Sequence, residues 1–315
     1  LGEPNSINSE ILAKSTAYKN KAIIIGNFNL LKSQLNILKI NIKLQKVKDI
    51  TKIKKKNKTL NVLDIPLKFR EPFSVDPKQS SMYVKKCLIA GHNLCLQKKL
   101  VGMINCSINK KNTFQNRNIG VTEFLARKSG IYKSEVMIIY NKKLSVVPLT
   151  THIKLKNVTK FIKKDLLKRK IATLHKYYLK YFKRSPRIAV LGLNPHNFEF
   201  KKGSEEMRII APVIKNLKRK FKISGPYSSD TVFFRENIKK FDVIIGMYHD
   251  QVLTPFKALF GLDAVNITLG LPYLRMSPDH GVAEDKKKLN ISSPQSLNKC
   301  IELISKLIKW NSKDL

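Results

Sequence analysis

The sequence predicts an α/β fold with a mixed, mostly parallel sheet. Short runs rich in Val, Ile and Leu alternate along the 315 residues with longer stretches of helical period, and no segment repeats another. The sheet is expected to be mixed, because only a short link separates the strand-like segments 135–140 and 144–148, as in an antiparallel hairpin. With 43% hydrophobic residues, a chain of this length can bury a core large enough for two subdomains.

The elements follow from the period of the apolar residues. Strands are predicted at 21–26, 60–65, 100–105, 135–140, 144–148, 187–192, 241–246 and 264–268. Helices are predicted at 81–98, 160–182, 203–220 and 294–310. The lysine- and asparagine-rich segments 43–58 and 110–118 are expected to be solvated loops or edge elements.

The composition bounds the class of protein. The net charge of +39 is typical of nucleic-acid-binding proteins, but only ten of the 61 basic residues are Arg, and the lysines are spread over almost every segment. We therefore favour solvated lysines over a nucleic-acid role, and we note that a positive surface attracts anionic ligands. The four cysteines form no Cys-x-x-Cys pair, and the sequence shows neither a signal pattern nor an apolar run of membrane-spanning length. A cytoplasmic protein without a membrane partner is expected.

Polar residues suited to chemistry concentrate between positions 247 and 281. The motifs Met247–Gln251 and Ser277–Gly281 enclose Lys257, Asn266 and Arg275, and apolar strand-like segments precede several of these residues. Open α/β sheets build their ligand sites at the carboxyl ends of strands. We therefore expect a functional site here.

Three histidines follow three different predicted strands. They are His152, His196 and His249, and in a doubly wound fold such strand ends converge on one crevice. Three neutral imidazoles with an open fourth position suit Zn²⁺ or another divalent transition metal, although any one of them alone could equally be a hydrogen-bonded loop histidine. In contrast, His92 and His175 fall inside helical stretches and are expected to be structural or surface residues.

Eight motifs, in order along essentially the whole chain, resemble those of the 4-hydroxythreonine-4-phosphate dehydrogenase family of vitamin B6 biosynthesis. They are Gly2–Pro4, Gly120 with Thr122–Phe124, Thr151–His152, Asn194–His196, Met247–Gln251, Val265–Pro272, Arg275 and Ser277–Gly281. The C-terminal motifs are long and mutually spaced, which makes the resemblance specific.

The resemblance implies a three-layer α/β/α fold related to isocitrate and isopropylmalate dehydrogenases, with two subdomains flanking an active-site cleft. We expect residues 1–125 and 281–315 to form the first subdomain, and residues 126–280 to form the second, which carries the metal histidines. Homodimers whose active sites draw on both chains are also implied.

The resemblance assigns roles to individual residues. A divalent metal, with Zn, Mg and Co as candidates, would be bound by His152, His196 and His249. Substrate would be bound by Thr122, Lys257, Asn266 and Arg275, and the cofactor, NAD or NADP, by Asp279, His280 and Gly281. Among these, Lys257 and Arg275 supply fixed positive charge for a phosphate or carboxylate.

Two aspartates complete the candidate site. Asp250, beside His249, is expected to act as a catalytic residue with Lys257, by orienting the metal histidine or receiving a proton, with helix capping as the alternative. In contrast, Asp230 is expected to be a helix N-cap first and a site residue second.

The chain departs from the family pattern at four places. The run Gly2–Ser9 lacks later glycines that are common in the family's N-terminal loop, and Val121 replaces a substrate-contacting histidine. The run His196–Glu199 replaces small residues after the histidine, and Glu284–Lys288 replaces a glycine-containing cofactor loop. These changes leave the substrate's identity and the details of cofactor binding open.

The resemblance implies an NAD-dependent, metal-requiring dehydrogenase. It would oxidise 4-phosphooxy-threonine to a 3-oxo acid, which decarboxylates to 3-amino-2-oxopropyl phosphate in pyridoxal phosphate biosynthesis. Two alternatives remain. One is a dehydrogenase of another phosphorylated four-carbon hydroxy acid, such as threonate or erythronate phosphate. The other is a basic nucleic-acid-binding protein with a decayed site.

Overall fold

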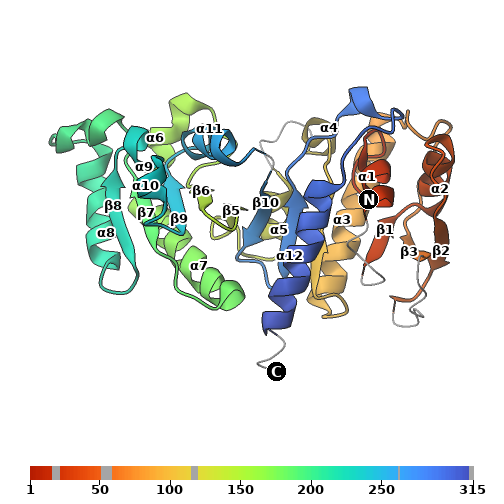
Figure 1. Ribbon diagram of the computed structural model, residues 1–315, viewed down its shortest axis with the longest axis horizontal. Helices are drawn as coiled ribbons and strands as arrows, with labels where there is room; N and C mark the ends of the chain where they lie inside the picture. Colours follow the sequence, from red (N-terminus) through yellow and green to blue (C-terminus); the bar gives the residue numbers. More distant parts are fainter. Residues whose placement is uncertain (16–21, 51–58, 115–119, 262, 312–315) are drawn as a thin grey trace. The chain divides into compact units, whose positions relative to one another are not determined.

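The computed structural model describes residues 1–15, 22–50, 59–114, 120–261 and 263–311 (Figure 1). The chain forms two compact units. The first unit comprises Leu1–Arg117 with Tyr273–Lys306, and the second comprises Asn118–Pro272 with Leu307–Leu315. The subdomain boundaries expected from the sequence, at 125/126 and 280/281, lie slightly later along the chain.

The second unit is built on a mixed sheet of six strands. They are β5 (Val136–Tyr140), β6 (Ser145–Pro148), β7 (Ile188–Leu191), β8 (Ile223–Tyr227), β9 (Val243–Gly246) and β10 (Val265–Leu269). Their order is β10–β5–β6–β9–β7–β8. Strand β5 pairs antiparallel with β10 and β6, whereas the remaining pairs are parallel. The predicted hairpin and the predicted mixed, mostly parallel sheet are therefore confirmed.

Helices cover both faces of this sheet, because the strands are apolar on both faces. The helices are α5 (Val121–Lys128), α6 (Val158–Phe161), α7 (Lys164–Phe182), α8 (Ala211–Leu217), α9 (Ser229–Val232), α10 (Arg235–Ile238) and α11 (His249–Phe260). Shorter turns are η2 (Leu155–Asn157), η3 (Pro195–Phe200) and the π-helical η4 (Glu206–Ile210). Figure 1 shows α7 and α11 on opposite sides of β5 and β6. This is the expected three-layer α/β/α arrangement.

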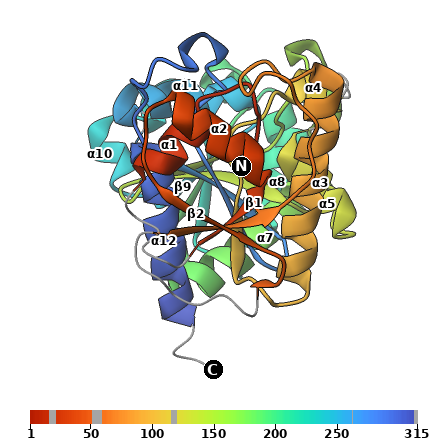
Figure 2. The ribbon, with the colours of Figure 1, turned by 90° about the vertical axis from the view of Figure 1, so that its right-hand side faces the viewer.

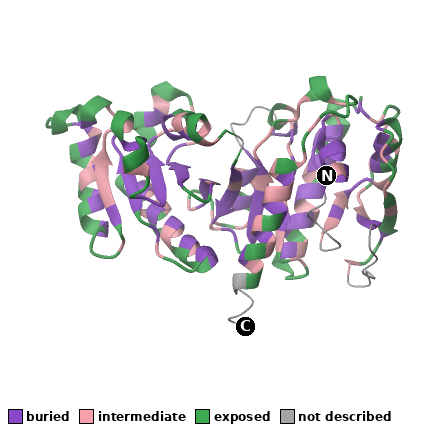
Figure 3. Ribbon diagram, in the orientation of Figure 1, coloured by how far each residue is buried: buried purple, intermediate pink, exposed green. Residues whose placement is uncertain are grey.

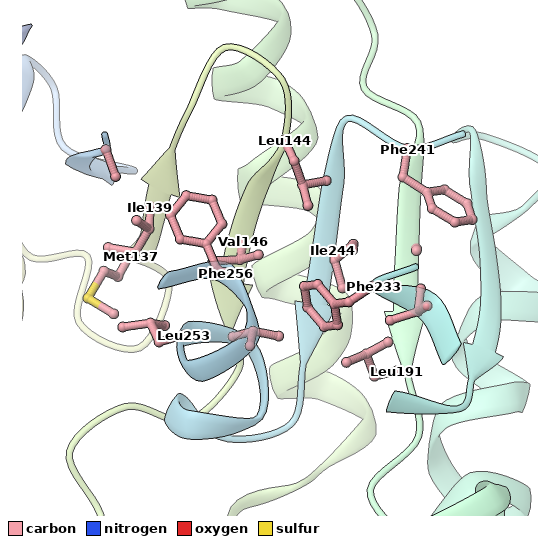
Figure 4. Close-up of a cluster of buried hydrophobic side chains, with 14 residues drawn as sticks. Met137, Ile139, Leu144, Val146, Leu191, Phe233, Phe241, Ile244, Leu253 and Phe256 are labelled. Atoms are coloured by element: carbon pink, nitrogen blue, oxygen red, sulfur yellow. The ribbon is translucent and has the colours of Figure 1, made fainter. Parts of the chain in front are cut away.

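In the second unit, alternate residues of a strand pack into cores on opposite faces of the sheet. Met137 and Ile139 of β5 pack in one buried cluster with Val252 and Phe256 of α11 (Figure 4). Successive strand residues face opposite sides, so the intervening Ile138, which is fully buried, belongs to the other face. Burying each side chain of this size stabilises the fold by roughly 1.5 to 3 kcal/mol. A slip of the strand pairing by one residue would move these side chains to the opposite face, so their burial fixes the register of the strands.

The first unit holds a three-stranded parallel sheet in the order β1–β3–β2, formed by β1 (Ile23–Gly26), β2 (Lys43–Val47) and β3 (Thr59–Asp64). Strand β4 (Gly102–Ile104) pairs in parallel with β11 (Leu274–Pro278). The helices are α1 (Asn8–Lys14), α2 (Phe28–Ile37), α3 (Pro77–Leu96), α4 (Lys110–Phe114) and the first part of α12 (Gln295–Asn311), with a 3-10 turn η5 (Glu284–Lys286). Figure 2 shows α1 and α2 side by side.

The structure tests the predicted elements directly. Each of the eight predicted strands corresponds to an observed strand whose ends lie within two residues of the prediction, and each predicted helix overlaps an observed helix. Segment 43–58 begins with the edge strand β2, as expected, but residues 51–58 lie outside the described residues. The loop expected at 110–118 is wrong for residues 110–114, which form α4 because Thr113 and Phe114 are buried; residues 115–118 are not described.

Burial follows the amphipathic pattern of the helices. Figure 3 shows buried strands and helices whose outer faces are exposed. No helix in the described part of the chain is long and apolar enough to cross a bilayer.

Candidate active site

Three neighbouring parallel strands carry the three candidate metal histidines. Strand β9 lies between β6 and β7 and runs parallel to both, so their carboxyl ends lie at one edge of the sheet. His152 follows β6, His196 follows β7 and His249 follows β9. The prediction that separate strand ends present these histidines at one edge is therefore confirmed.

His152 and His249 are the pair that the structure brings together. Their ring centroids are 6.0 Å apart, and each side chain is about one third exposed, 34% for His152 and 35% for His249. His196 belongs to the same unit but is much more exposed, at 76%. Among the described residues, no group of three or more His, Cys, Asp or Glu has the spacing that holds a metal ion.

Each of the three imidazoles turns its Nδ1 atom toward a carboxylate. The distances are 2.7 Å from His249 Nδ1 to Asp250 Oδ1, 3.7 Å from His152 Nδ1 to Glu123 Oε1, and 3.8 Å from His196 Nδ1 to Asp230 Oδ2. A carboxylate beside Nδ1 leaves Nε2 as the nitrogen for a ligand, which is the usual arrangement around histidines that bind metals. This donor set of imidazoles with carboxylate partners fits a divalent cation.

The aspartates differ from the sequence expectation in one case. Asp250 contacts the His249 ring from the first turn of α11, which agrees with an orienting role. The N-cap expectation for Asp230 is wrong, because Ser228 is the N-cap of α9 and Asp230 lies within its first turn. The Asp230 side chain instead lies beside His196.

The backbone around His196 is unusual. All five residues from His196 to Phe200 have positive φ, between 48° and 56°. Buried Glu206 holds the start of this turn by accepting hydrogen bonds from Leu193 N (2.7 Å) and Asn194 N (2.8 Å). Burial would raise the pKa of Glu206, but the hydrogen bonds from Asn194 and Leu193 outweigh it and lower the pKa. Sequence reasoning gave Glu206 no role, because the carboxylate acts from a helical turn well after the histidine.

Gln251 ties the strand ends together. Its buried amide accepts from Met247 N at 2.6 Å and donates to Gly192 O at 2.8 Å and Ser229 Oγ at 2.7 Å. One side chain thus joins the ends of β7 and β9 to α9. Gln251 ends the motif Met247–Gln251 that the sequence analysis identified, but only the three-dimensional contacts show the role of its amide.

Glu123 is the most buried carboxylate beside a candidate metal histidine. Burial alone would raise its pKa, but His152, a backbone hydrogen bond and the Thr151 hydroxyl together lower the pKa to about 2. Glu123 is therefore ionised at neutral pH. Its negative charge faces the imidazole.

The second unit also holds three of the predicted substrate residues. Thr122 is buried in α5, and its hydroxyl lies 3.2 Å from that of Thr268 in β10. Asn266 in β10 has a buried Oδ1 that accepts no hydrogen bond within the described structure, so it can serve a ligand. Lys257 is half-buried on α11. Val121, where the family has a histidine, is a buried apolar residue at the start of α5.

The remaining candidates lie in the first unit. Arg275 in β11 is buried, and its Nε donates to Asn105 Oδ1 at 2.7 Å. The backbone N–H of Asp279 donates to Ser296 Oγ at 2.8 Å, and His280 Nδ1 lies 2.8 Å from Gly281 O. A Cβ atom at Gly281 would meet nothing within 4 Å, so this glycine is not required by close packing within the chain.

Two histidines outside the site have structural contacts. His92 Nδ1 lies 2.8 Å from the Tyr273 hydroxyl in a buried contact. His175 Nε2 lies 3.0 Å from Ser185 Oγ, and burial lowers the pKa of His175. Both agree with the structural role expected from the sequence.

A mixed sheet covered by helices, with histidines and carboxylates at the carboxyl edge of its parallel strands, is the architecture of an α/β enzyme. Comparison with known proteins specifies the family. A family model described as "Pyridoxal phosphate biosynthetic protein PdxA" matches residues 18–304, and the chain belongs to this family of oxidoreductases. The predictions of family, fold class and enzyme class are confirmed.

Two curated relatives and one solved structure match nearly the whole chain. A curated relative from Sulfurihydrogenibium sp. (strain YO3AOP1), named 4-hydroxythreonine-4-phosphate dehydrogenase, is 36% identical over 96% of this chain and 95% of its own. Another so named, from Aquifex aeolicus (strain VF5), is 36% identical over 98% and 97%. The crystal structure of a 4-hydroxythreonine-4-phosphate dehydrogenase from Klebsiella pneumoniae has a TM-score of 0.84 and 29% identity, covering 97% of each chain.

Proposed function

We propose that this protein oxidises 4-phosphooxy-threonine with a nicotinamide cofactor and a divalent metal. The product is a 3-oxo acid, which loses CO₂ to give 3-amino-2-oxopropyl phosphate for pyridoxal phosphate biosynthesis. The observation that carries the proposal is the set of three histidines at the ends of β6, β7 and β9, in a chain that matches a relative named 4-hydroxythreonine-4-phosphate dehydrogenase over 96% of its length.

Different residues of the chain would bind the metal and receive the proton. His152, His196 and His249 would hold the cation through Nε2, because their Nδ1 atoms face carboxylates. The bound cation would supply a positive charge that lowers the pKa of the substrate hydroxyl, and a nicotinamide cofactor, NAD or NADP, would supply the hydride acceptor. Asp250 would orient His249, and its carboxylate would also receive a proton in the reaction.

Substrate and cofactor would be bound by separate groups. Lys257 and Arg275 would pair with the phosphate or carboxylate, and Lys257 could also assist the reaction as a proton carrier. The Asn266 Oδ1 and the Thr122 hydroxyl would supply neutral hydrogen bonds. The buried Asn266 Oδ1, which accepts no hydrogen bond from the described residues, supports this role. The cofactor would be contacted by the segment that contains Asp279, His280 and Gly281.

We further propose a homodimer with shared active sites, in the cytoplasm. The shared sites rest on the family resemblance, and the four free, buried cysteines agree with a reducing compartment. Zn, Mg and Co are the candidate metals.

The metal assignment is tested by single alanine substitutions of His152, His196 and His249. Each should lower the bound metal measured by elemental analysis and abolish turnover, whereas His92→Gln should change neither, because His92 contacts Tyr273. Full metal content and activity in all three alanine variants would show that the site is misassigned.

A further inference from the structure

Glu123 has a contact pattern that joins helix α5 to the end of β6. Its Oε2 accepts a hydrogen bond from Gly120 N at 2.9 Å, which anchors the carboxylate at the start of α5. Its Oε1 accepts from the Thr151 hydroxyl at 3.1 Å and lies 3.7 Å from His152 Nδ1. Both oxygens are therefore fixed by local donors, and the carboxylate cannot turn away from the imidazole without breaking these bonds.

The His152 ring needs such a partner. Its Nδ1 is buried and makes no hydrogen bond within the described structure, and Glu123 Oε1 is slightly beyond hydrogen-bonding range. A buried polar atom without a partner is costly, and an adjacent carboxylate favours the tautomer with hydrogen on Nδ1. That tautomer leaves the Nε2 lone pair available.

Gly120 provides the room for this contact. A Cβ atom there would lie 2.8 Å from Glu123 Oε2 and 3.4 Å from His152 Cε1. The Gly120 backbone, with φ −94° and ψ −179°, is open to alanine, so an added methyl group would act by displacing these two side chains rather than by straining the chain.

We propose that Glu123 is the positioning residue of His152: it sets the Nδ1–H tautomer and the orientation of the ring, so that Nε2 faces the divalent cation. This inference rests on the metal site proposed above. Among the three carboxylates beside the histidines, Glu123 is 15% exposed, whereas Asp230 and Asp250 are 56% and 80% exposed. Water therefore screens the charges of the two aspartates more strongly than the charge of Glu123.

Zinc binding to the metal-free protein provides the test, measured by competition with a chromogenic chelator. In Glu123→Gln, the amide nitrogen would donate to Nδ1, moving the ring hydrogen to Nε2. We expect zinc affinity to fall by about 10- to 100-fold, the usual cost of losing a carboxylate partner of a metal histidine. Gly120→Ala should weaken zinc binding in the same direction while keeping the carboxylate.

Histidine tautomers give a readout that a purely structural role would not change. Long-range ¹H–¹⁵N spectra of the metal-free protein should show His152 with hydrogen on Nδ1, and Glu123→Gln should move it to Nε2. The matched control is Asp76→Ala, which removes the side-chain cap of α3, where Asp76 accepts from Lys78 N and Gln79 N. It should lower thermal stability without changing zinc affinity or the His152 tautomer.

The outcomes separate the two proposals. If His152→Ala abolishes zinc binding while Glu123→Gln and Gly120→Ala keep wild-type affinity and tautomer, the role of Glu123 is overturned and the metal site stands. If His152→Ala binds zinc as the wild type does, the metal site itself is wrong.

Discussion

At the residue scale, the turn after His196 contains an identifiable strain. Residues His196 to Phe200 all have positive φ, a region that costs non-glycine residues roughly 1 to 2 kcal/mol each. The sequence shows small family residues replaced by bulk here, but the left-handed backbone could not be predicted from that substitution alone. The strained residues include the candidate metal ligand His196.

This strain predicts that glycine is a more stable replacement than alanine for Glu199, which has φ 48° and a 74% exposed side chain. In an ordinary helix the order is the reverse. Glu199→Gly should be more stable than Glu199→Ala by about 1 kcal/mol, since only glycine avoids the cost of this backbone. Both variants lose the exposed ion pair with Lys201, so this loss cancels from the difference between their unfolding free energies. Urea unfolding would measure the difference.

Arg169, exposed within helix α7, is the matched control. There Arg169→Ala should be more stable than Arg169→Gly by about 1 kcal/mol, the usual helix preference. The strain argument fails if alanine is also the more stable replacement at position 199.

A second prediction concerns Lys257. Substitution by Met keeps its length and removes its charge, so one charge-assisted contact of roughly 1.5 to 3 kcal/mol is lost and KM for the phosphorylated substrate should rise about 10- to 100-fold. The control is Lys239→Met, which removes an exposed lysine at the C-terminal end of α10 and should leave KM unchanged. An unaltered KM in Lys257→Met would remove Lys257 from the substrate site.

The candidate ligands could be predicted from the sequence, but most of their supporting contacts could not. Strand-end histidines are visible because an apolar run ends just before each one. In contrast, the partners Glu123 and Glu206 act across helix starts and turns, so no spacing in the sequence indicates them. Their roles depend on three-dimensional packing.

At the element scale, Asp242 joins the starts of two neighbouring strands. It precedes β9, and its Oδ2 accepts from Arg187 N at 2.8 Å while Oδ1 accepts from Arg184 at 2.8 Å. Burial would raise the pKa of Asp242, but the Arg187 side chain, the Arg187 backbone N–H and Arg184 outweigh it and lower the pKa below 3.8.

A pH dependence of stability follows. Because the folded pKa is below the unfolded pKa of about 3.9, the Asp242 contribution is complete above the unfolded pKa and is lost as pH falls through the folded pKa. The difference in unfolding free energy between wild type and Asp242→Asn should be constant from pH 7 to 5 and shrink below pH 4. Urea unfolding at several pH values measures it.

An exposed carboxylate in α7 serves as the comparison, and Asp165→Asn should cost much less at pH 7. A wild-type advantage over Asp242→Asn that stays constant down to pH 2.5 would contradict the assignment of the lowered pKa.

Some elements escaped sequence analysis for physical reasons. Helix α11 was not predicted, because Pro255 interrupts its helical pattern. Edge strand β8 contains Gly225 and Pro226, residues that usually argue against a strand. Strands with long apolar runs, such as β5, were predicted well because their burial on both faces leaves little ambiguity.

At the scale of the whole molecule, the family membership and the fold agree. The parallel order β6–β9–β7 gives one edge three histidines, and long motifs distributed over the chain identify the family. The identity of the substrate stayed open in the sequence analysis because Val121 replaces a substrate-contacting histidine. The structure shows that the Val121 side chain is buried and apolar. Substrate choice therefore has to be measured.

The most direct measurement is NADH formation from 4-phosphooxy-threonine deuterated at the carbinol carbon, with CO₂ followed in the same reaction. We expect one deuterated NADH for each CO₂, loss of both products with a chelator, and recovery when Zn, Mg or Co is returned. Threonate and erythronate phosphates should react more slowly. Absence of NADH from the amino acid in the metal-loaded protein, or release of CO₂ without NAD, would contradict the proposed function.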